Sequence, residues 1–383
     1  MKRKGIVLAL AVVAAGGVQA QDRDRSGDSE LTLAEVDALT HRLDMMPEIY
    51  GQLGLVMEHR DTDDTAVSRN RGTAGSETAF RDSNSWIGLR NRTELMPGTE
   101  GFFRAEWRSI PTRPGEDRNR MFDEHVEYAY IGLEGDFGRI WGGVDDTVYE
   151  QQLDHVANFF EGEFRHEDGG RDTRRHPLGP YTTGRDRLVQ YTTPSWGDFR
   201  MHAAVQLKED GNPEVGNGNG NGDEKESRPY QAVLSYTPGN WEWALGMDSN
   251  DGGEMLGATP TEPERLQAGN ENTYGGRMTY DGERWHFTAQ YQHRKDIASV
   301  AALLTSYRIG PNRFSLAWER ERDELAQQVS GGDLDSETTN AYTAQVMHDL
   351  TESMAVYVEG YKASSNERTP DRFDLMVGAR YRF

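Results

Sequence analysis

The last eleven residues of the chain, 373–383, read FDLMVGARYRF and bear most directly on the fold. Apolar side chains recur at every second position along one face of this segment: Phe373, Leu375, Val377, Ala379, Tyr381 and Phe383. The intervening positions form the other face: Asp374, Met376, Gly378, Arg380 and Arg382. Strict alternation predicts a β-strand with one face toward an apolar medium and the other toward water. The segment alone fits both an ordinary edge strand and the closing strand of a membrane barrel.

The start of the chain has the layout of a secretory signal peptide. Residues 1–20 open with Lys2, Arg3 and Lys4, continue with an apolar stretch at 6–18, and end in V-Q-A. This order predicts cleavage after residue 20 and export of the mature chain. An amino-terminal membrane anchor is the alternative, but the apolar stretch is short for a membrane span.

Composition narrows the class of protein. The 383 residues carry a formal charge of −22, and removing the three cations of the leader leaves about −25. Nucleic acid is therefore not an expected partner, because phosphate backbones need clustered Lys and Arg. The chain contains no cysteine, which excludes disulfides and thiolate metal sites. Only 35% of the residues are hydrophobic, and low bulk hydrophobicity with local alternation is typical of transmembrane barrels.

Sixteen segments fit strands bounded by turn residues. They lie at 49–59, 85–94, 101–110, 126–133, 138–144, 187–193, 199–208, 229–237, 241–249, 273–281, 284–294, 299–309, 313–322, 340–348, 354–362 and 372–383. Short turns such as Pro238-Gly239-Asn240 alternate with long polar connections such as 209–228. This rhythm is typical of bacterial outer-membrane barrels, which have short periplasmic turns and long outer loops. The sequence predicts an all-β fold, a transmembrane antiparallel β-barrel of sixteen strands over residues 48–383.

The faces of individual strands can be assigned from the same alternation. Within 241–248 the outward residues would be Trp241, Trp243, Leu245 and Met247. The segments 285–292 and 314–319 repeat this pattern, with polar residues on the opposite face. So many polar and charged side chains could not be buried in a dry core, so we expect a polar lumen. Aromatic residues near the strand ends should form girdles at the membrane boundary.

Residues 21–47 precede the first strand and do not alternate. Val36, Leu39, Leu43 and Met46 have the spacing of a helix over 29–46. The segment is either a short periplasmic helix, paired with its copies in a trimer, or a disordered leader.

Several segments resemble one family. An aromatic final residue with Tyr381 two positions earlier resembles the closing strand of outer-membrane barrels, which the barrel assembly machinery reads. The segments 48–59 (EIYGQLGLVMEH), 129–143, 189–197 and 347–361 are similar to strands of Gram-negative general porins. The resemblance covers most of the mature chain. It implies a homotrimer of sixteen-stranded barrels in the outer membrane, in contact with lipid and lipopolysaccharide. Each pore would be narrowed by an inward-folded third outer loop.

That loop corresponds to residues 145–184 of this chain. Its acidic residues are candidates for the pore constriction: Asp145, Asp146, Glu150, Asp154, Glu161 and Glu163. Arginines follow at Arg171, Arg174 and Arg175. Charges of both signs at a narrow point would set a transverse field and orient dipolar solutes.

The pore wall departs from the family pattern. The usual basic positions are occupied by Gln52, Trp86, Glu127 and Gly143. The inward basic residues that we expect instead on the wall, beside Glu127, are Arg90, Arg92, Arg104 and Arg108. The alternative for each arginine is a solvated lumen charge or a structural ion pair. The negative balance of the chain favours cations and neutral solutes.

Signals for catalysis are lacking in the sequence. It has no G-x-S-x-G elbow and no H-E-x-x-H pair. The Gly-Asn run at 216–222 lacks the Lys-Ser/Thr of a phosphate loop. We therefore expect no enzyme, cofactor or metal site, but a channel for passive diffusion of small hydrophilic solutes and ions. The alternatives are an outer-membrane enzyme and a structural or adhesive barrel with a plugged lumen.

Overall fold

The computed structural model describes residues 46–63, 75–108, 125–156, 159–161, 187–207, 228–249, 272–294, 298–323, 337–366 and 371–383. These residues belong to one compact unit. The predicted signal peptide at 1–20, and the segment 21–47 apart from its last two residues, lie outside the described residues.

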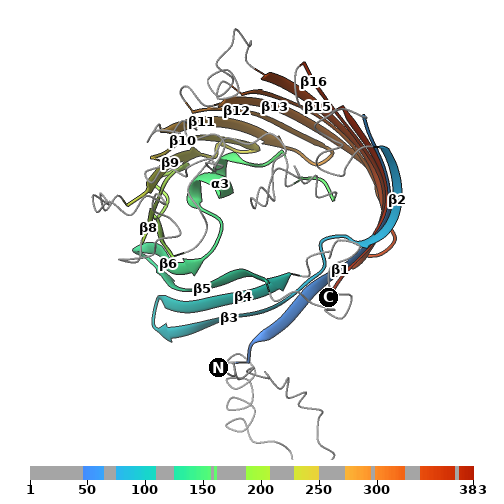
Figure 1. Cartoon of the computed structure of the whole chain (residues 1–383). Helices are drawn as coiled ribbons and strands as arrows, with labels where there is room; N and C mark the ends of the chain where they lie inside the picture. The colour runs from blue at the N-terminus through green and yellow to red at the C-terminus, as the bar shows by residue number, and fades with distance from the viewer. Residues whose placement is uncertain are drawn as a thin grey trace, which may run out of the picture. The chain divides into compact units, whose positions relative to one another are not determined.

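Within the described ranges, seventeen β-segments form a single antiparallel sheet that closes on itself (Figure 1). They are β1 (Glu48–Thr62), β2 (Gly75–Asp82), β3 (Trp86–Met96), β4 (Thr99–Arg108), β5 (His125–Gly135), β6 (Gly138–Val144), β7 (Leu188–Thr192), β8 (Phe199–Gln206), β9 (Tyr230–Tyr236), β10 (Trp241–Asp248), β11 (Thr273–Asp281), β12 (Trp285–Arg294), β13 (Ala298–Ile309), β14 (Asn312–Asp323), β15 (Glu337–Asp349), β16 (Met354–Ser365) and β17 (Arg372–Arg382). A six-residue helix, α3 (Val148–Leu153), follows β6.

The segments β2 and β3 are two halves of one strand, so the barrel has the predicted sixteen strands. β2 pairs with residues 55–62 of β1 and β3 pairs with residues 48–52. Between them Asn84 has a positive φ of 61°. A Cβ at Gly54 would lie only 1.8 Å from the carbonyl oxygen of Ser83, so the break requires glycine there. β2 was not among the predicted strands, because GSETAFRD has too few apolar residues to show alternation.

The predicted closing strand does close the barrel. β1 and β17 pair from Gln52↔Arg382 to Thr62↔Arg372, which brings the C-terminus beside β1 (Figure 1). The Gly51 amide donates to the Phe383 carbonyl over 2.9 Å, and the Phe383 amide donates back over 3.1 Å. A Cβ at Gly51 would lie 2.7 Å from the Phe383 ring, so glycine makes room for the last side chain.

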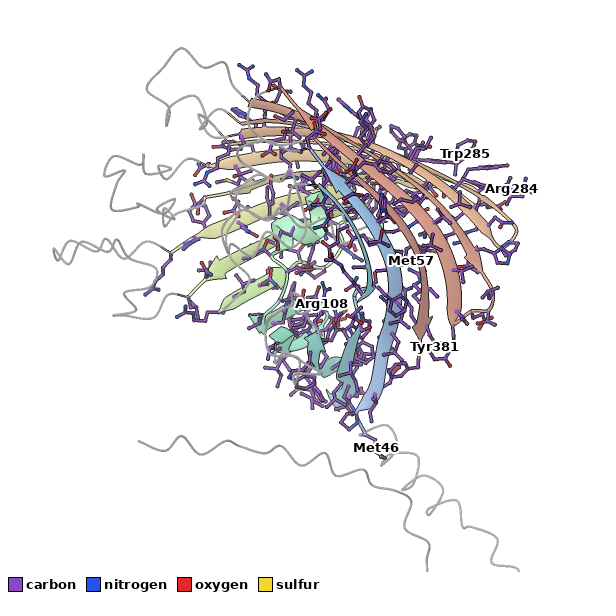
Figure 2. All side chains as sticks on the ribbon, turned by 45° about the vertical axis from the view of Figure 1, so that its right-hand side comes forward. Met46, Met57, Arg108, Arg284, Trp285 and Tyr381 are labelled. Atoms are coloured by element: carbon purple, nitrogen blue, oxygen red, sulfur yellow. The ribbon has the colours of Figure 1, made fainter. Side chains whose placement is uncertain are left out.

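The two faces of the barrel differ as predicted. Outward side chains such as Leu245 and Leu316 are 66% and 59% exposed, whereas the inward Asp248 and Thr288 are fully buried. Trp285 projects from the outer surface (Figure 2). This large apolar outer surface is what a lipid environment requires. Among the described residues, no helix combines the length and apolar character needed to cross a membrane.

Aromatic pairs mark the barrel end that carries the short turns. Trp285 lies 4.4 Å from Tyr307, and Trp241 lies 4.9 Å from Tyr280, measured between ring centroids. These residues lie at strand ends, beside the turns between β11 and β12 and between β9 and β10. Their positions agree with an aromatic girdle at one membrane boundary.

Substitution of Gly51 by valine should weaken closure of the barrel. The added side chain would collide with Phe383 and with the Trp86 carbonyl oxygen, which lies 2.7 Å from the Cβ position. We expect a loss of about 1–3 kcal/mol in barrel stability, measured as a lower temperature for the heat-induced shift in gel migration. The matched control is Gly360→Val, because a Cβ at Gly360 meets nothing within 4 Å. Equal shifts in both variants would contradict the steric explanation.

Candidate channel lumen

The chain turns into the barrel directly after β6, and Asp145 anchors this entry. Its Oδ2 accepts hydrogen bonds from Trp141 Nε1 (2.7 Å), Gln151 Nε2 (3.2 Å) and Gln190 Nε2 (3.3 Å). The amide of Asp146 donates to its other oxygen over 2.9 Å. Burial, together with the neighbouring Asp146 carboxylate, raises the pKa of Asp145 to about 6.

The helix α3 begins with a capping box. The Glu150 amide donates to Thr147 Oγ1 over 3.2 Å, and the Thr147 amide donates to Glu150 Oε2 over 3.3 Å. This reciprocal pair satisfies two amides that the first turn leaves unpaired. Glu150 therefore has a local structural partner at the start of the helix.

The inner wall is hollowed where α3 lies against it. The buried Tyr149 and Leu153 pack with small wall residues such as Ala204 and Ala244. A Cβ at Gly275 would lie 2.4 Å from Tyr149 Oη, and one at Gly246 would lie 2.8 Å from Leu153 Cδ1. Figure 1 shows α3 inside the ring of strands, beside β9 and β10. Two inward glycines on β10 and β11 thus create the seat of this helix.

The next part of the segment continues along the inner wall toward β14. The amides of His155 and Val156 both approach Gln290 Oε1 on β12, at 3.1 and 3.4 Å. Val156 packs with Ala302, Leu304 and Ala317 of β13 and β14, and Phe159 and Phe160 contact this cluster. These contacts hold the segment against the wall.

Residue Glu161 lies at the seam of the barrel, where β1 pairs with β17. Its amide donates to Glu359 Oε2 on β16 over 3.0 Å, and its carboxylate forms an ion pair with Arg380 on β17. Its carbonyl accepts a 3.5 Å hydrogen bond from Ser83 Oγ at the break between β2 and β3, and Ser83 also lies 3.2 Å from Tyr357 Oη. The segment is therefore fixed on both sides of the seam.

Five of the six predicted acidic constriction residues lie in this described segment, and Glu163 lies outside the described residues. Asp146 accepts from Tyr128 Oη over 3.0 Å, and Asp154 Oδ1 lies 3.5 Å from Gln290 Nε2. With Asp145, Glu150 and Glu161 described above, every one of the five has a contact that positions the segment. Their role at a constriction stays a prediction.

The predicted wall arginines are all held in ion pairs. Arg90 lies 2.8 Å from Glu48, Arg92 lies 2.6 Å from Glu100 and 3.0 Å from Glu134, and Arg108 lies 3.8 Å from Glu127. Arg104 pairs with Glu106. The set extends along the length of β3 and β4, from Arg92 near their turn to Arg108 at the last position of β4. It lines the wall without gathering into one cluster.

Aromatic rings lie beneath three of these arginines, two of them within 5 Å of the ring centroid. The guanidinium of Arg90 lies 4.5 Å from the centroid of the Tyr50 ring, and that of Arg104 lies 4.1 Å from the Tyr128 ring. Tyr50 Oη donates to Glu106 over 2.7 Å. The wall on β1 to β5 is therefore a fixed layer of mixed charge on aromatic rings.

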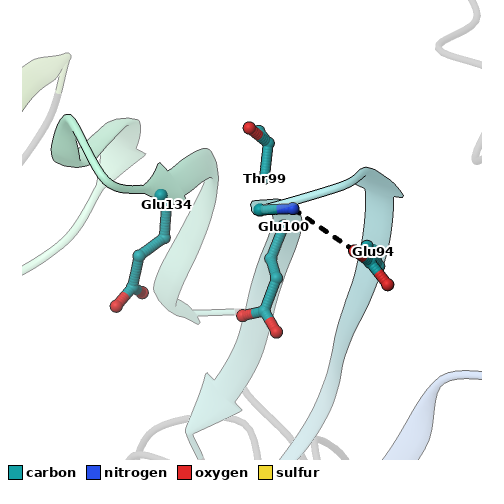
Figure 3. Close-up of a pocket in the computed structure, with 6 residues that line it drawn as sticks. Glu94, Thr99, Glu100 and Glu134 are labelled. Carbon is teal, nitrogen blue, oxygen red and sulfur yellow. Dashed lines mark hydrogen bonds between the residues drawn. The ribbon is translucent and has the colours of Figure 1, made fainter.

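A cavity of about 410 Å³ lies at the rim beneath this wall (Figure 3). Its lining residues are Glu94, Gly98, Thr99, Glu100, Glu134 and Gly135. They lie in the β3–β4 turn and at the strand ends beside it and beside the β5–β6 turn. Arg92 binds two of the three carboxylates, so this rim carries only part of its formal negative charge. Among the described residues, no group of three or more His, Asp or Glu side chains could hold a metal ion.

A second inward basic group was not among the predicted site residues. It comprises Arg313 on β14 with Arg380 and Arg382 on β17. The alternation of 373–383 already placed the last two on the water face, so a full reading of every inward face would have found them. Arg277 on β11 also lies inside, where it pairs with Glu242.

The sequence matches the family described as "Gram-negative porin" over residues 7–369. The chain belongs to this family. The porin is therefore an outer-membrane channel protein, and its predicted family and sixteen-stranded fold are confirmed.

Individual relatives agree with this assignment. The major outer membrane protein P.IB of Neisseria sicca is 24% identical over 342 residues, 88% of this chain and 84% of that protein. The porin fold also matches the anion-selective porin of Comamonas acidovorans, with a TM-score of 0.60, 15% identity and 88% and 99% of the two chains covered. OmpF of Salmonella typhi, solved with daunomycin, matches with a TM-score of 0.62, 15% identity and 88% and 97% coverage.

Filling the seat of α3 should loosen the segment and leave the barrel intact. In Gly275→Val the new side chain would occupy the space of Tyr149 Oη, at a cost of about 1–3 kcal/mol in docking. Hydrogen exchange should show lost protection of the amides at 148–153, with gel migration unchanged. The matched control is Gly276→Val, whose Cβ position faces Leu245 on the outer surface, 3.1 Å away. If protection of α3 is unaffected in Gly275→Val, the glycine seat is not what positions the helix.

Docking of the segment should also depend on pH through Asp145. Because its pKa is raised to about 6 in the docked state, that state takes up a proton before the released segment does. Docking therefore gains stability as the pH falls through about 6 toward the ordinary carboxyl value of about 3.9, and loses it as the pH rises. Corrected for intrinsic exchange rates, amide protection in 148–156 should be higher near pH 5 than near pH 7. Asp145→Asn should remove the difference, and a wild-type protein without it would refute the assignment.

Proposed function

We propose that the porin forms a water-filled channel for passive diffusion of small hydrophilic solutes and ions. The observation that carries the proposal is the polar inner face of a barrel whose family is that of porins. The described part of the inward segment also supports it, because residues 145–156 and 159–161 pack along the wall from β7 to β17. Packed in that position, they would narrow the lumen of such a channel. The acidic residues Asp145 to Glu163 would mark the constriction.

We further propose that the channel prefers cations. The support is the formal charge of −22, which raises the local concentration of cations near the mouths of the pore. One protein of similar fold is named an anion-selective porin, so the fold alone does not set the sign of the preference. The charges of this chain have to decide it.

The assembly that we propose is a homotrimer in the outer membrane, reached after cleavage of residues 1–20. OmpT of Vibrio cholerae, which matches with a TM-score of 0.57 at 13% identity over 88% and 99% of the two chains, is described in a trimer form. The exposed apolar outer surface would contact lipid, lipopolysaccharide and neighbouring subunits. Tyr381 and Phe383, on the outer face of the closing strand, would be read by the barrel assembly machinery.

The burial of two inward hydroxyl groups that lie beside histidines, those of Ser235 and Thr288, supports a porin without enzymatic activity. His202 lies 2.9 Å from Thr192 Oγ1 and 3.0 Å from Ser235 Oγ, an arrangement that resembles an activated nucleophile. However, Ser235 is only 5% exposed, so a substrate could not reach its oxygen. A second group of this kind consists of Asp281, His286 and Thr288. A substrate could not reach its hydroxyl group either, because Thr288 is fully buried.

Reconstitution in planar bilayers should give stepwise conductance, with permeability that falls as solute size rises. In a salt gradient the reversal potential should favour cations, because of the acidic balance of the chain. Folded, inserted protein that never conducts would overturn the channel and favour a plugged barrel. A reversal potential that favours anions would overturn only the cation preference.

A further inference from the structure

One tryptophan on the inner face of the barrel is open to the lumen. Trp86 pairs with Gln52, which is buried on the inner side, whereas the next residue, Ile87, is 41% exposed on the outer side. Within the described strands one other tryptophan faces inward, Trp141, which is only 5% exposed and donates from Nε1 to Asp145. Trp86 is partly exposed, so its indole is the one that a solute in the lumen can reach.

The indole of Trp86 is supported from one side. The Tyr50 ring fills the space at Gly88, because a Cβ there would lie 2.9 Å from that ring. Tyr50 meets Trp86 in an edge contact, with 5.2 Å between the ring centroids and 72° between the ring planes. A contact of this geometry covers at most one face of the indole. Among the described residues, no other ring and no guanidinium stacks on Trp86.

The N–H group of the indole is also available. Trp86 Nε1 donates to no other described residue, and it is not one of the buried polar atoms that lack a partner. The group is therefore accessible to solvent. An exposed indole combines an apolar face with one hydrogen-bond donor. A solute that matches Trp86 has a flat apolar face and an acceptor at its edge.

The two residues that flank Trp86 across the strands are already engaged. Arg108, its neighbour on β4, lies 3.8 Å from Glu127. Gln52, its neighbour on β1, uses both its amide nitrogen and its amide oxygen in hydrogen bonds within the barrel. The free groups that this position offers to a solute are therefore those of the indole.

The position of Trp86 brings it close to the inward segment. It directly follows the break between β2 and β3, and Ser83 in that break donates to the carbonyl of Glu161. A solute that passes this end of the segment inside the barrel also passes the indole.

We propose that Trp86 is a binding site for neutral sugars in their ring form. The π face of an indole carries negative partial charge, which attracts the carbon-bound hydrogens on the face of a sugar ring. The hydroxyl oxygens at the edge of that ring accept from the indole N–H. An open-chain polyol has similar hydroxyl groups but no ring face, so it should bind more weakly. The site rests on the proposed channel function.

The test is block of single-channel potassium current in planar bilayers by glucose, with the open-chain sorbitol as the matched solute. Wild-type porin should show saturable block by glucose and weaker block by sorbitol. Trp86→Ala should raise the half-blocking concentration of glucose about fivefold through the loss of stacking. Trp86→Phe should raise it about twofold, because phenylalanine keeps a ring face and loses the N–H. Block by sorbitol should not change in either variant.

The matched control is Trp107→Ala, on the neighbouring strand but on the opposite face. Trp107 pairs with Ile87 and is 37% exposed on the outer surface. Heat-modifiable gel migration should show that each variant is folded. If Trp86→Ala does not fold, Trp86→Phe decides alone, because its ring still packs on Tyr50. Equal block by glucose and sorbitol, unchanged block in the folded Trp86 variants, or an equal loss in Trp107→Ala overturns the site.

A binding measurement separates the sugar site from conduction. In saturation-transfer NMR with folded porin in detergent micelles, the ring protons of glucose should receive saturation, and Trp86→Ala should reduce it. If the protein does not conduct but this difference persists, the channel proposal fails and the sugar site stands. If it conducts and neither block nor saturation responds to the Trp86 variants, the channel stands and the site fails. Saturation of nicotinamide, a planar aromatic solute, without saturation of glucose would overturn the assignment to sugars.

Discussion

The pairing of β1 with β17 is the constraint on which the rest of the structure depends. No water is available in the bilayer core to bond a free strand edge, so every backbone group there must find a partner within the protein. Residues 52–62 and 372–382 meet this requirement by pairing along their whole length. The seam also explains the apolar ending of the chain, because the Phe383 ring lies on the outside, over the space left by Gly51.

The closed barrel has a wide interior, and its wall makes room for the segment that follows β6. A sixteen-stranded ring is too large to be filled by its own wall side chains. The segment after β6 therefore packs into the lumen, and the wall loses side chains at Gly246 and Gly275 to receive α3. Its far end, Glu161, bonds to Arg380, Glu359 and Ser83, which come from both sides of the seam. These contacts of Glu161 can exist together only in the closed barrel.

The sequence predicts the ring better than its interior, for a physical reason. Alternation and turn residues are local, so they identified each strand except β2, whose rim position leaves it mostly polar. They also predicted the inward and outward faces of the strands to which they were applied, such as 241–248 and 373–383. They could not predict partners across the lumen: Glu161 and Arg380 are 219 positions apart, and only closure brings them together. The sequence also could not predict the two glycines that make room for α3. A glycine in a strand does not indicate which side chain packs against it.

These contacts separate the net charge of the chain from the field inside the pore. Asp145 accepts four hydrogen bonds, Glu150 caps a helix and Glu161 neutralises Arg380. Acidic residues that are engaged in this way contribute less to the field in the lumen than their number in the sequence indicates. Among the arginines, Gln52 and Gln345 orient Arg382 and Arg313 through hydrogen bonds, and the carboxylates of Glu161 and Asp349 act electrostatically on both. The field at a given point of the lumen therefore depends on which charges are paired there, and the net charge of the chain does not determine it.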